Sequence, residues 1–262
     1  MRDAKARWDT TLNTLTLTAL PGIGEIEPGD DLAGILGAAL AGLDVPPPPH
    51  AVLVVAQKVV SKAEGRYVTL DSVKVTPRAT ELAALTRKDA RIVELVLGES
   101  VEVLRAKPDV LIVRHRLGYV MANAGIDRSN VGGKDRVLLL PADPDGSAQA
   151  LRSSILQRYG HELGVIVCDS FGRPWRKGVT NVALGAAGVP ALIDRRGEAD
   201  RHGRRLEVTE VALADQLASA AGLLMGEGAE SRPAVLISGL TLTAPAVPAL
   251  RLIRPLHEDL FR

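Results

Sequence analysis

Five short apolar runs constrain what this chain can fold into more than any other feature. They are rich in valine, isoleucine and leucine, and they occupy residues 51–55, 110–113, 137–140, 164–168 and 234–238. A strand with one solvated face alternates polar and apolar side chains, whereas a strand covered on both faces is apolar throughout. The runs therefore predict buried β-strands.

Helical patterns separate these runs. Apolar side chains recur at spacings of three and four over residues 31–43, 81–97, 148–159 and 210–225, which is typical of amphipathic helices. Asp30 or Asp31 is suited to cap the first of them, because a carboxylate accepts hydrogen bonds from the free N–H groups of a first turn. Residues 67–75 resemble a hairpin and interrupt regular alternation of strand and helix. The pattern predicts a mixed α/β (α+β) fold with mixed sheets rather than a simple doubly wound sheet.

Two breaks divide the chain. Residues 46–49 are four consecutive prolines, which lack the N–H group of a helix and predict an exposed extended connector. Residues 141–147, PADPDGS, favour a loop and place a division near residue 145. We therefore expect residues 1–262 to form a single unit of two intertwined subdomains.

Composition excludes several classes of function. The chain has 32 Lys and Arg against 31 Asp and Glu, so no overall positive field would hold a nucleic-acid backbone. Aromatic residues make up 3% of the chain, too few for the stacking platforms of single-strand binders. No run reaches the ~18 apolar residues that span a bilayer, and the N-terminus lacks the apolar segment of a signal peptide. The single cysteine, Cys168, favours a cytoplasmic protein without disulfides.

Several common motifs fail at one position each. The Gly-Gly-Lys at residues 132–134 has Arg128 where a phosphate-binding loop needs glycine. A dinucleotide-binding pattern begins at residue 22, but Glu27 stands at its third glycine. A zinc-protease HExxH pattern begins at residue 161, but Val165 replaces its second histidine. The sequence therefore does not support a phosphate-binding loop, a dinucleotide-binding motif or a zinc-protease motif.

Five polar, glycine-bearing segments lie at the ends of predicted strands, where binding sites are commonly built. In the first, residues 19–32, flexible glycines and a helix start would present backbone N–H groups to an anion; a plain turn with an N-cap is the alternative. In the second, residues 56–66, Lys58, Lys62 and Arg66 recur every four residues. A helical turn would place these three cations on one face, suited to a polyphosphate, and a solvated basic face is the alternative.

The third segment, residues 115–131, combines Asn123, Asp127 and Asn130. Carboxylate and amide oxygens are hard ligands that suit magnesium or manganese bound with nucleotide phosphates. The alternative is an Asx-turn, in which these side chains satisfy local backbone groups. His115, at the start of the segment, either orients an acidic substrate or caps its loop.

The fourth segment, residues 165–188, follows a predicted strand directly. Asp169 and Ser170 supply a carboxylate beside a hydroxyl, which suits a divalent cation. Arg173 and Arg176 flank a Pro-Trp pair and suit carboxylate or phosphate groups; surface arginines after a turn are the alternative.

The fifth segment, residues 225–232, carries glycines that permit close backbone approach. Glu227 offers a ligand for a second cation, and a helix C-cap followed by a loop is the alternative. Cys168, in the strand before the fourth segment, is expected to be a small buried hydrophobic residue.

Taken together, the segments resemble one family, the coenzyme F420-0:L-glutamate ligases, which are the γ-glutamyl ligases of deazaflavin cofactor biosynthesis. The resemblance spans residues 20–239 and is carried by ALPGIGEI, QKVVSKAEGR, YVMANAGIDRSNV, CDSFGRPWRKGVTNVALGAAG and MGEGAESR. It implies a ligase that couples GTP hydrolysis to attachment of L-glutamate to the terminal carboxylate of F420-0, through an acyl phosphate. It also implies Mg²⁺ or Mn²⁺, K⁺ as a further cation, and a homodimer. From the chain length we expect no nitroreductase-like C-terminal domain of the kind fused to some members.

The resemblance also implies roles for particular residues. The nucleotide-binding residues carried over are Leu20, Pro21, Gly22, Ile23, Gln57, Lys58, Lys62, Asn130, Met225, Gly226, Gly228, Ala229, Glu230, Ser231 and Arg232. The implied metal ligands are Asp127, Asp169, Ser170 and Glu227. We expect catalysis to involve Lys62, Asp127, Asp169, Arg173 and Arg176. Metal ions and cationic side chains neutralise phosphoryl charge during such a transfer.

Three positions depart from the family pattern. Gln57 stands where many members have a small hydroxyl residue, Ser170 where threonine is frequent, and Glu227 where glutamine is frequent. Serine keeps the ligand oxygen, while the extra carboxylate would tighten metal binding or alter the nucleotide preference. Two other functions stay open: a related carboxylate–amine ligase with another acceptor, and a non-catalytic protein that binds a nucleotide or a deazaflavin. The aspartates at 127 and 169 argue against the second, because a binding module can dispense with metal chemistry.

Overall fold

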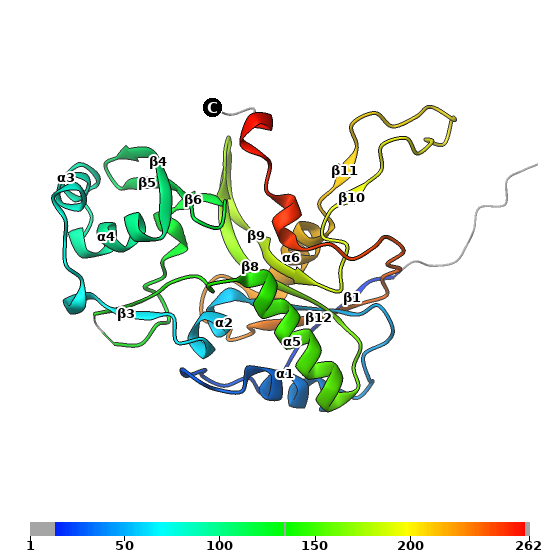
Figure 1. The fold of residues 1–262 in the computed structure, drawn as a ribbon. Helices are drawn as coiled ribbons and strands as arrows, with labels where there is room; N and C mark the ends of the chain where they lie inside the picture. Colours follow the sequence, from blue (N-terminus) through cyan, green and yellow to red (C-terminus); the bar gives the residue numbers. More distant parts are fainter. Residues whose placement is uncertain (1–13, 134, 260–262) are drawn as a thin grey trace, which may run out of the picture.

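The computed structural model describes residues 14–133 and 135–259 (Figure 1). Its strands are β1 Thr16–Ala19, β2 Val52–Ala56, β3 Tyr67–Thr69, β4 Ser100–Lys107, β5 Val110–His115, β6 Val120–Ala122, β7 Arg136–Leu138, β8 Gly164–Arg173, β9 Arg176–Ala187, β10 Ile193–Asp194, β11 Glu210–Val211 and β12 Ala234–Ser238. Its α-helices are α1 Leu32–Ala41, α2 Gln57–Ala63, α3 Pro77–Thr86, α4 Ala90–Gly98, α5 Pro144–Tyr159 and α6 Leu213–Met225. Within the described ranges, no helix has the length and apolar character needed to cross a membrane.

A five-stranded sheet forms the centre of the molecule, with the order β1-β12-β2-β8-β9. Strands β2 and β8 are parallel, with Val52 opposite Gly164 and Ala56 opposite Cys168, while every other neighbouring pair is antiparallel. Its three central strands come from the apolar runs predicted at residues 51–55, 164–168 and 234–238. The predicted mixed α/β (α+β) class is confirmed.

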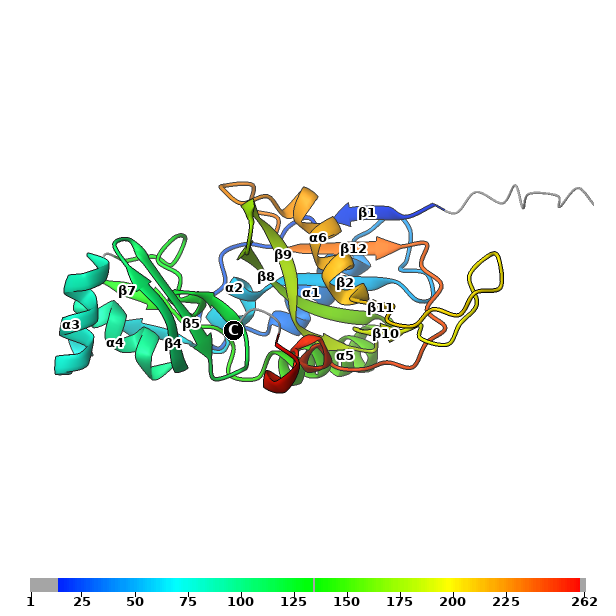
Figure 2. The ribbon, with the colours of Figure 1, turned by 90° about the horizontal axis from the view of Figure 1, so that it is seen from above.

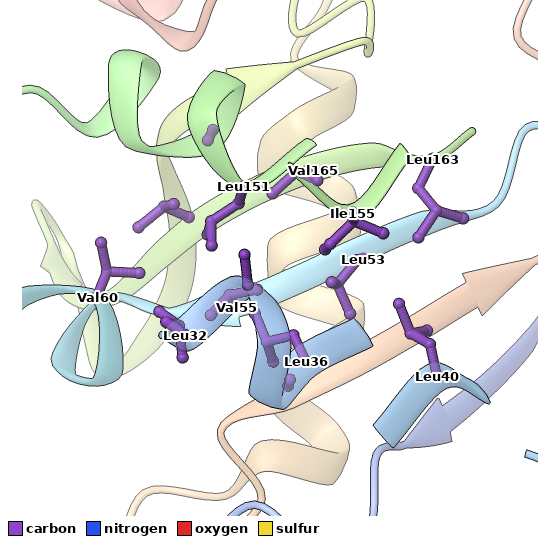
Figure 3. Packing of buried hydrophobic residues seen from close by; sticks show 14 of the residues in the cluster. Leu32, Leu36, Leu40, Leu53, Val55, Val60, Leu151, Ile155, Leu163 and Val165 are labelled. Atoms are coloured by element: carbon purple, nitrogen blue, oxygen red, sulfur yellow. The ribbon is translucent and has the colours of Figure 1, made fainter. Parts of the chain in front are cut away.

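Helices cover both faces of this sheet, which explains why its central strands are apolar throughout. On one face, Leu53 and Val55 of β2 pack with α1 and α5, and Figure 3 shows Leu36 and Ile155 directed toward Leu53. On the other face, α6 packs against the alternate β2 residues, Val52 and Val54 (Figure 1). Successive strand residues point to opposite faces, so burial on both faces requires an unbroken apolar run.

Residues 67–138, in the chain between β2 and β8, form a lobe at one side of the main sheet (Figure 2). It contains the three-stranded sheet β4-β5-β6, the two-stranded pair β3-β7, and helices α3 and α4. The lobe has a hydrophobic core of its own, which includes Leu82, Val93 and Leu111. The Tyr119 hydroxyl donates a hydrogen bond to the Leu184 carbonyl and so ties the lobe to β9.

The single helix predicted over residues 81–97 was wrong, because the structure has two helices there. Helix α3 ends at Thr86, and its C-cap residue Arg87 has a left-handed φ of 55°. Asp89 then caps α4 by accepting a hydrogen bond from the Arg91 N–H. An arginine in this conformation gives no glycine signal in the sequence, so the apolar spacing alone concealed the break.

The hairpin predicted over residues 67–75 was also wrong. Strand β3 pairs antiparallel with β7, far along the chain, and not with its own neighbours. The strand predicted at 137–140 ends at Leu138, and residues 210–211 belong to β11 rather than to α6. Helix α5 begins at Pro144, before the predicted residue 148, because Asp143 caps it. The division near residue 145 stays a prediction.

Other local expectations were met. Asp31 is the N-cap of α1 and accepts a hydrogen bond from the Gly34 N–H at 3.0 Å. Residues 46–49 form no helix or strand and are mostly exposed, as expected of a proline connector.

The central strand should carry much of the stability. Leu53→Ala, at a side chain with no exposed surface, should lower the free energy of unfolding by about 2–5 kcal/mol through lost burial and a residual cavity. Leu223→Ala, at a side chain that is 83% exposed on α6, should change it by less than about 0.5 kcal/mol. Urea unfolding followed by circular dichroism measures both. Equal losses in the two variants would contradict this assignment of the core.

Candidate functional site

The ends of four strands meet at one edge of the main sheet. The carboxyl ends of β1 and β2 lie there, beside the amino end of β12. The part of β8 that pairs with β2 ends at the same place. Two backbone hydrogen bonds close this edge, from the Leu20 N–H to the Ala234 carbonyl and from the Ala56 N–H to the Pro233 carbonyl. The segments that follow these strands are therefore brought together, although they are far apart in the sequence.

A cavity of about 710 Å³ lies at this edge, between the sheet and the lobe. The predicted site residues that line it are Ile23, Gln57, Lys58, Lys62, Asn130, Asp169, Ser170, Met225, Gly226, Glu227, Gly228, Ala229, Ser231 and Arg232. Residues from all five segments thus share one cavity. Lys134, in the Gly-Gly-Lys sequence beside it, lies outside the described residues.

Several predicted residues do not line the cavity. Leu20 is buried in the core beneath it, and Pro21 and Gly22 lead into its wall from β1. Glu230 turns back on its own loop and accepts a hydrogen bond from the Gly228 N–H. Arg173 and Arg176 flank the tight turn between β8 and β9, where Trp175 is 91% exposed. The expected catalytic role of these two arginines stays a prediction.

Asp127 of the lobe is not among the residues that line the cavity, but its carboxylate contacts two that are, Gln57 and Lys58. Its carboxylate accepts a hydrogen bond from Gln57 Nε2 at 2.8 Å and lies 3.5 Å from Lys58 Nζ. The Gln57 amide is itself fixed, because its Oε1 accepts a hydrogen bond from Ser61 Oγ at 2.9 Å. The partners of Asp127 are thus on helix α2 and not on the local backbone, which disfavours the Asx-turn alternative.

The two aspartates repel each other electrostatically. Burial raises the pKa of Asp169 to about 7, and the charges of Asp127 and Glu227 add to this rise while Lys58 opposes it. Burial also raises the pKa of Asp127, against the opposing effect of Lys58 and Gln57. One lysine therefore partly neutralises two carboxylates, and negative charge is left over at the cavity edge.

This donor set fits a divalent cation. Carboxylates and a serine hydroxyl are the hard oxygen ligands that Mg²⁺ and Mn²⁺ prefer, and a cation would relieve the charge that raises the pKa of Asp169. Within residues 14–133 and 135–259, no three His, Cys, Asp or Glu side chains are grouped closely enough to hold a metal on their own. Ser170 and oxygens of a bound substrate would have to complete the coordination.

The predicted row of three cations is only partly present. Lys58 and Lys62 lie on α2, where Lys58 also contacts Ser129 Oγ and Lys62 forms an ion pair with Glu25. Arg66 follows the helix end and was wrongly placed on the same face. Its guanidinium instead donates to the Leu140 carbonyl and pairs with Glu99.

Two other candidates have structural roles. Cys168 lines the cavity, but burial raises the pKa of its thiol to about 12, so at neutral pH it is protonated and no nucleophile. His115 is buried, and its Nδ1 accepts a hydrogen bond from the Leu117 N–H, which is the loop-capping role.

Sequence reasoning missed several cavity residues. Tyr67 and Arg136 line the side formed by the lobe, and Glu25 and Asn181 line it elsewhere. Glu25 lies within the first polar segment and Asn181 within the fourth, so these segments contained a signal for them. Tyr67 and Arg136 face the cavity because β3 pairs with β7, which no local pattern indicated.

Comparison of the sequence with known proteins identifies a family. The family model described as F420-0:Gamma-glutamyl ligase matches residues 22–239. A curated relative named coenzyme F420:L-glutamate ligase, from Methanopyrus kandleri, is 44% identical over 255 residues, which cover 96% of this chain and 99% of the relative. Proteins of the same name from Methanothermobacter thermautotrophicus and Haloarcula marismortui are 42% and 44% identical. Their matches cover 95% and 84% of this chain, and 99% and 85% of the relatives.

The charge left on Asp169 predicts a pH-dependent stability in the absence of metal. Its folded pKa of about 7 lies above its usual value of 3.8, so the carboxyl favours the folded state below about pH 4 and this contribution is lost as pH rises through 7. In Asp169→Asn the side chain cannot ionise, so the variant does not lose this stability as pH rises. At about pH 8 in EDTA the variant should therefore be more stable than the parent, by up to about 4 kcal/mol at ~1.4 kcal/mol per pKa unit.

Urea unfolding at about pH 4 and about pH 8 measures this difference. The gain should shrink to a small fraction at the lower pH, where Asp169 is protonated in the folded state and about half protonated in the unfolded state. A gain of the same size at both values would show that the charge is not its cause.

Proposed function

This chain belongs to the F420-0:Gamma-glutamyl ligase family, and we propose that it attaches L-glutamate to the terminal carboxylate of coenzyme F420-0 in F420 biosynthesis. As a member of that family it is a ligase that forms carbon–nitrogen bonds. We propose further that the reaction consumes GTP, requires Mg²⁺ or Mn²⁺, and passes through an acyl phosphate. A cytoplasmic homodimer with K⁺ as a further cation completes the proposal.

The convergence of five chain segments on one cavity supports this function most directly. A ligase of this kind must hold a nucleotide, an acidic acceptor and an amino acid together, and about 710 Å³ accommodates a substantial part of such a set. The cationic side chains and carboxylates that line this cavity match a polyphosphate and the cation that accompanies it.

The proposed chemistry has two steps. The acceptor carboxylate attacks the γ-phosphorus of GTP, and GDP leaves with the electrons of the broken bond. The glutamate amine then attacks the acyl carbon, inorganic phosphate leaves, and the nitrogen loses a proton as the amide forms. Each step builds negative charge on oxygen, so preorganised positive charge lowers both barriers.

Residues of this chain have distinct parts in these steps. Lys58 and Lys62 neutralise phosphate oxygens, and Lys62 is well placed because its side chain is buried with its amine at the cavity. Gln57 holds the Asp127 carboxylate in a fixed orientation. Asp127, Asp169, Ser170 and Glu227 would hold the divalent cation, which supplies charge neutralisation when bound.

The proposal is tested by mass spectrometry of a reaction that contains F420-0, L-glutamate, GTP and Mg²⁺ or Mn²⁺. We expect glutamylated F420 and GDP in equal amounts, and no product in excess EDTA. ATP in place of GTP is the matched control for nucleotide choice. Full glutamylation in EDTA, or without a nucleoside triphosphate, would reject the proposed mechanism. Glutamylation of another carboxylate acceptor, but not of F420-0, would favour the related-ligase alternative.

Asp127→Asn and Asp169→Asn should each lower the rate of ligation by at least ~100-fold. Each removes one ligand charge for the proposed divalent cation beside the phosphates while keeping the shape of the side chain. The two losses should be less than additive in the double variant, because each disables the same cluster. Turnover measured on folded proteins decides this, and near-normal turnover in either single variant would remove that aspartate from the site.

A further inference from the structure

A cationic side chain on the lobe side of the cavity has no role in the site described so far. Arg136 of β7 lies with its guanidinium carbon 3.9 Å from the centre of the Tyr67 ring, on β3. Both side chains line the cavity. Stacking of this kind holds a guanidinium plane in place while its N–H groups remain available to a ligand.

The register of the strands explains why the pair faces the site. Tyr67 is opposite Leu138 and Thr69 is opposite Arg136, so Tyr67 and Arg136 are diagonal neighbours on one face of the β3-β7 pair. Leu138 also exchanges two backbone hydrogen bonds with Asp127, each 2.9 Å long. Directly opposed residues of antiparallel chains point to the same face, so Arg136 shares a face with the carboxylate of Asp127.

The charges that line the cavity single out Arg136. Among the described residues, the cationic side chains that line the cavity are Lys58, Lys62, Arg136 and Arg232. Lys58 is engaged by Asp127, and Lys62 by Glu25. Arg232 lies in the loop that the family resemblance assigns to the nucleotide. Within the described residues no carboxylate pairs with Arg136, which is held by an aromatic ring instead.

We propose that Arg136, positioned by Tyr67, binds a carboxylate of one of the two acidic substrates, either the acceptor or the incoming L-glutamate. An arginine fork binds a carboxylate through two parallel hydrogen bonds, which a lysine cannot reproduce. Asp127 and Tyr67 pair with Leu138 from its two opposite sides, so they are two strand spacings apart, roughly 10 Å. The proposed contact therefore lies beside the reacting groups and not on them. This inference rests on the proposed function, since it assigns the substrate contacts of the same cavity.

The experiment measures the KM of F420-0, L-glutamate and GTP separately for Arg136→Met and Arg136→Lys. Arg136→Met should raise the KM of F420-0 or of L-glutamate by ~10-fold or more, with the KM of GTP changed less than ~2-fold. The substrate whose KM rises is the one that Arg136 binds. Arg136→Lys should recover only part of the loss. Arg78→Met, at an exposed position on α3 of the same lobe, is the control and should match the parent.

Tyr67 variants separate positioning from a merely structural role. Tyr67→Phe keeps the ring and should behave like the parent, whereas Tyr67→Leu should raise the same KM several-fold. In the Arg136→Met background, Tyr67→Leu should add less than ~2-fold, because the ring acts through the guanidinium. Unchanged KM values for both acidic substrates, or a change for GTP alone, would overturn the inference.

Calorimetric binding of each substrate to the same variants keeps this test separate from that of the proposed function. If the parent protein does not glutamylate F420-0, the proposed function fails. Weaker binding of an acidic substrate to Arg136→Met would still support the assignment of Arg136. Unaltered binding of F420-0 and L-glutamate would reject it, whatever the activity. Thermal unfolding of each variant confirms that its fold is intact.

Discussion

The parallel pairing of β2 with β8 is the constraint on which the rest of this structure depends. Parallel neighbours cannot be joined by a tight turn, so the chain that leaves β2 at Gln57 must cross over before it returns at Gly164. The same pairing puts the carboxyl ends of both strands at one edge, which places Gln57 near Asp169. The crossing chain has room for the whole lobe, and the lobe supplies Asp127 to that edge. The cavity is therefore a direct consequence of the sheet topology.

Within the lobe, a left-handed turn directs Asp127 toward the sheet. Asn123, Ala124 and Gly125 have φ values of 52°, 53° and 68°. Such a conformation costs a non-glycine residue roughly 1–2 kcal/mol, so burial of Ala124 in the lobe core must offset it. A Cβ atom at position 125 would lie 2.9 Å from Cγ of the buried Leu140, and the left-handed φ adds strain for any residue other than glycine.

Much of the cavity could be predicted from sequence, because polar segments after buried strands converge wherever those strands share an edge. The prediction failed where side-chain position depends on contacts between distant parts of the chain. Tyr67 and Arg136 meet only through the β3-β7 register, and Arg66 turns toward Glu99 of the lobe. Strand β8 was expected to end at residue 168, yet it continues to Arg173 in a long hairpin with β9. That extension carries Arg173 to an exposed turn, although its neighbours in the sequence line the cavity.

The carboxylates of the site lie at the end of the most deeply buried strands, and this placement determines their electrostatics. Asp169 follows a segment of β8 that is fully buried, and partial removal from water is what raises its pKa to about 7. Such a placement is unfavourable for folding, so it persists only where surrounding apolar burial compensates for it, as the two cores on either side of β2 and β8 do. On the lobe, whose core is smaller, the corresponding carboxylate of Asp127 needs Gln57 and Lys58 of helix α2 to balance it. The charge that remains uncompensated is concentrated where the lobe meets the sheet. A cation bound there would therefore stabilise the junction between the two parts as well as the site.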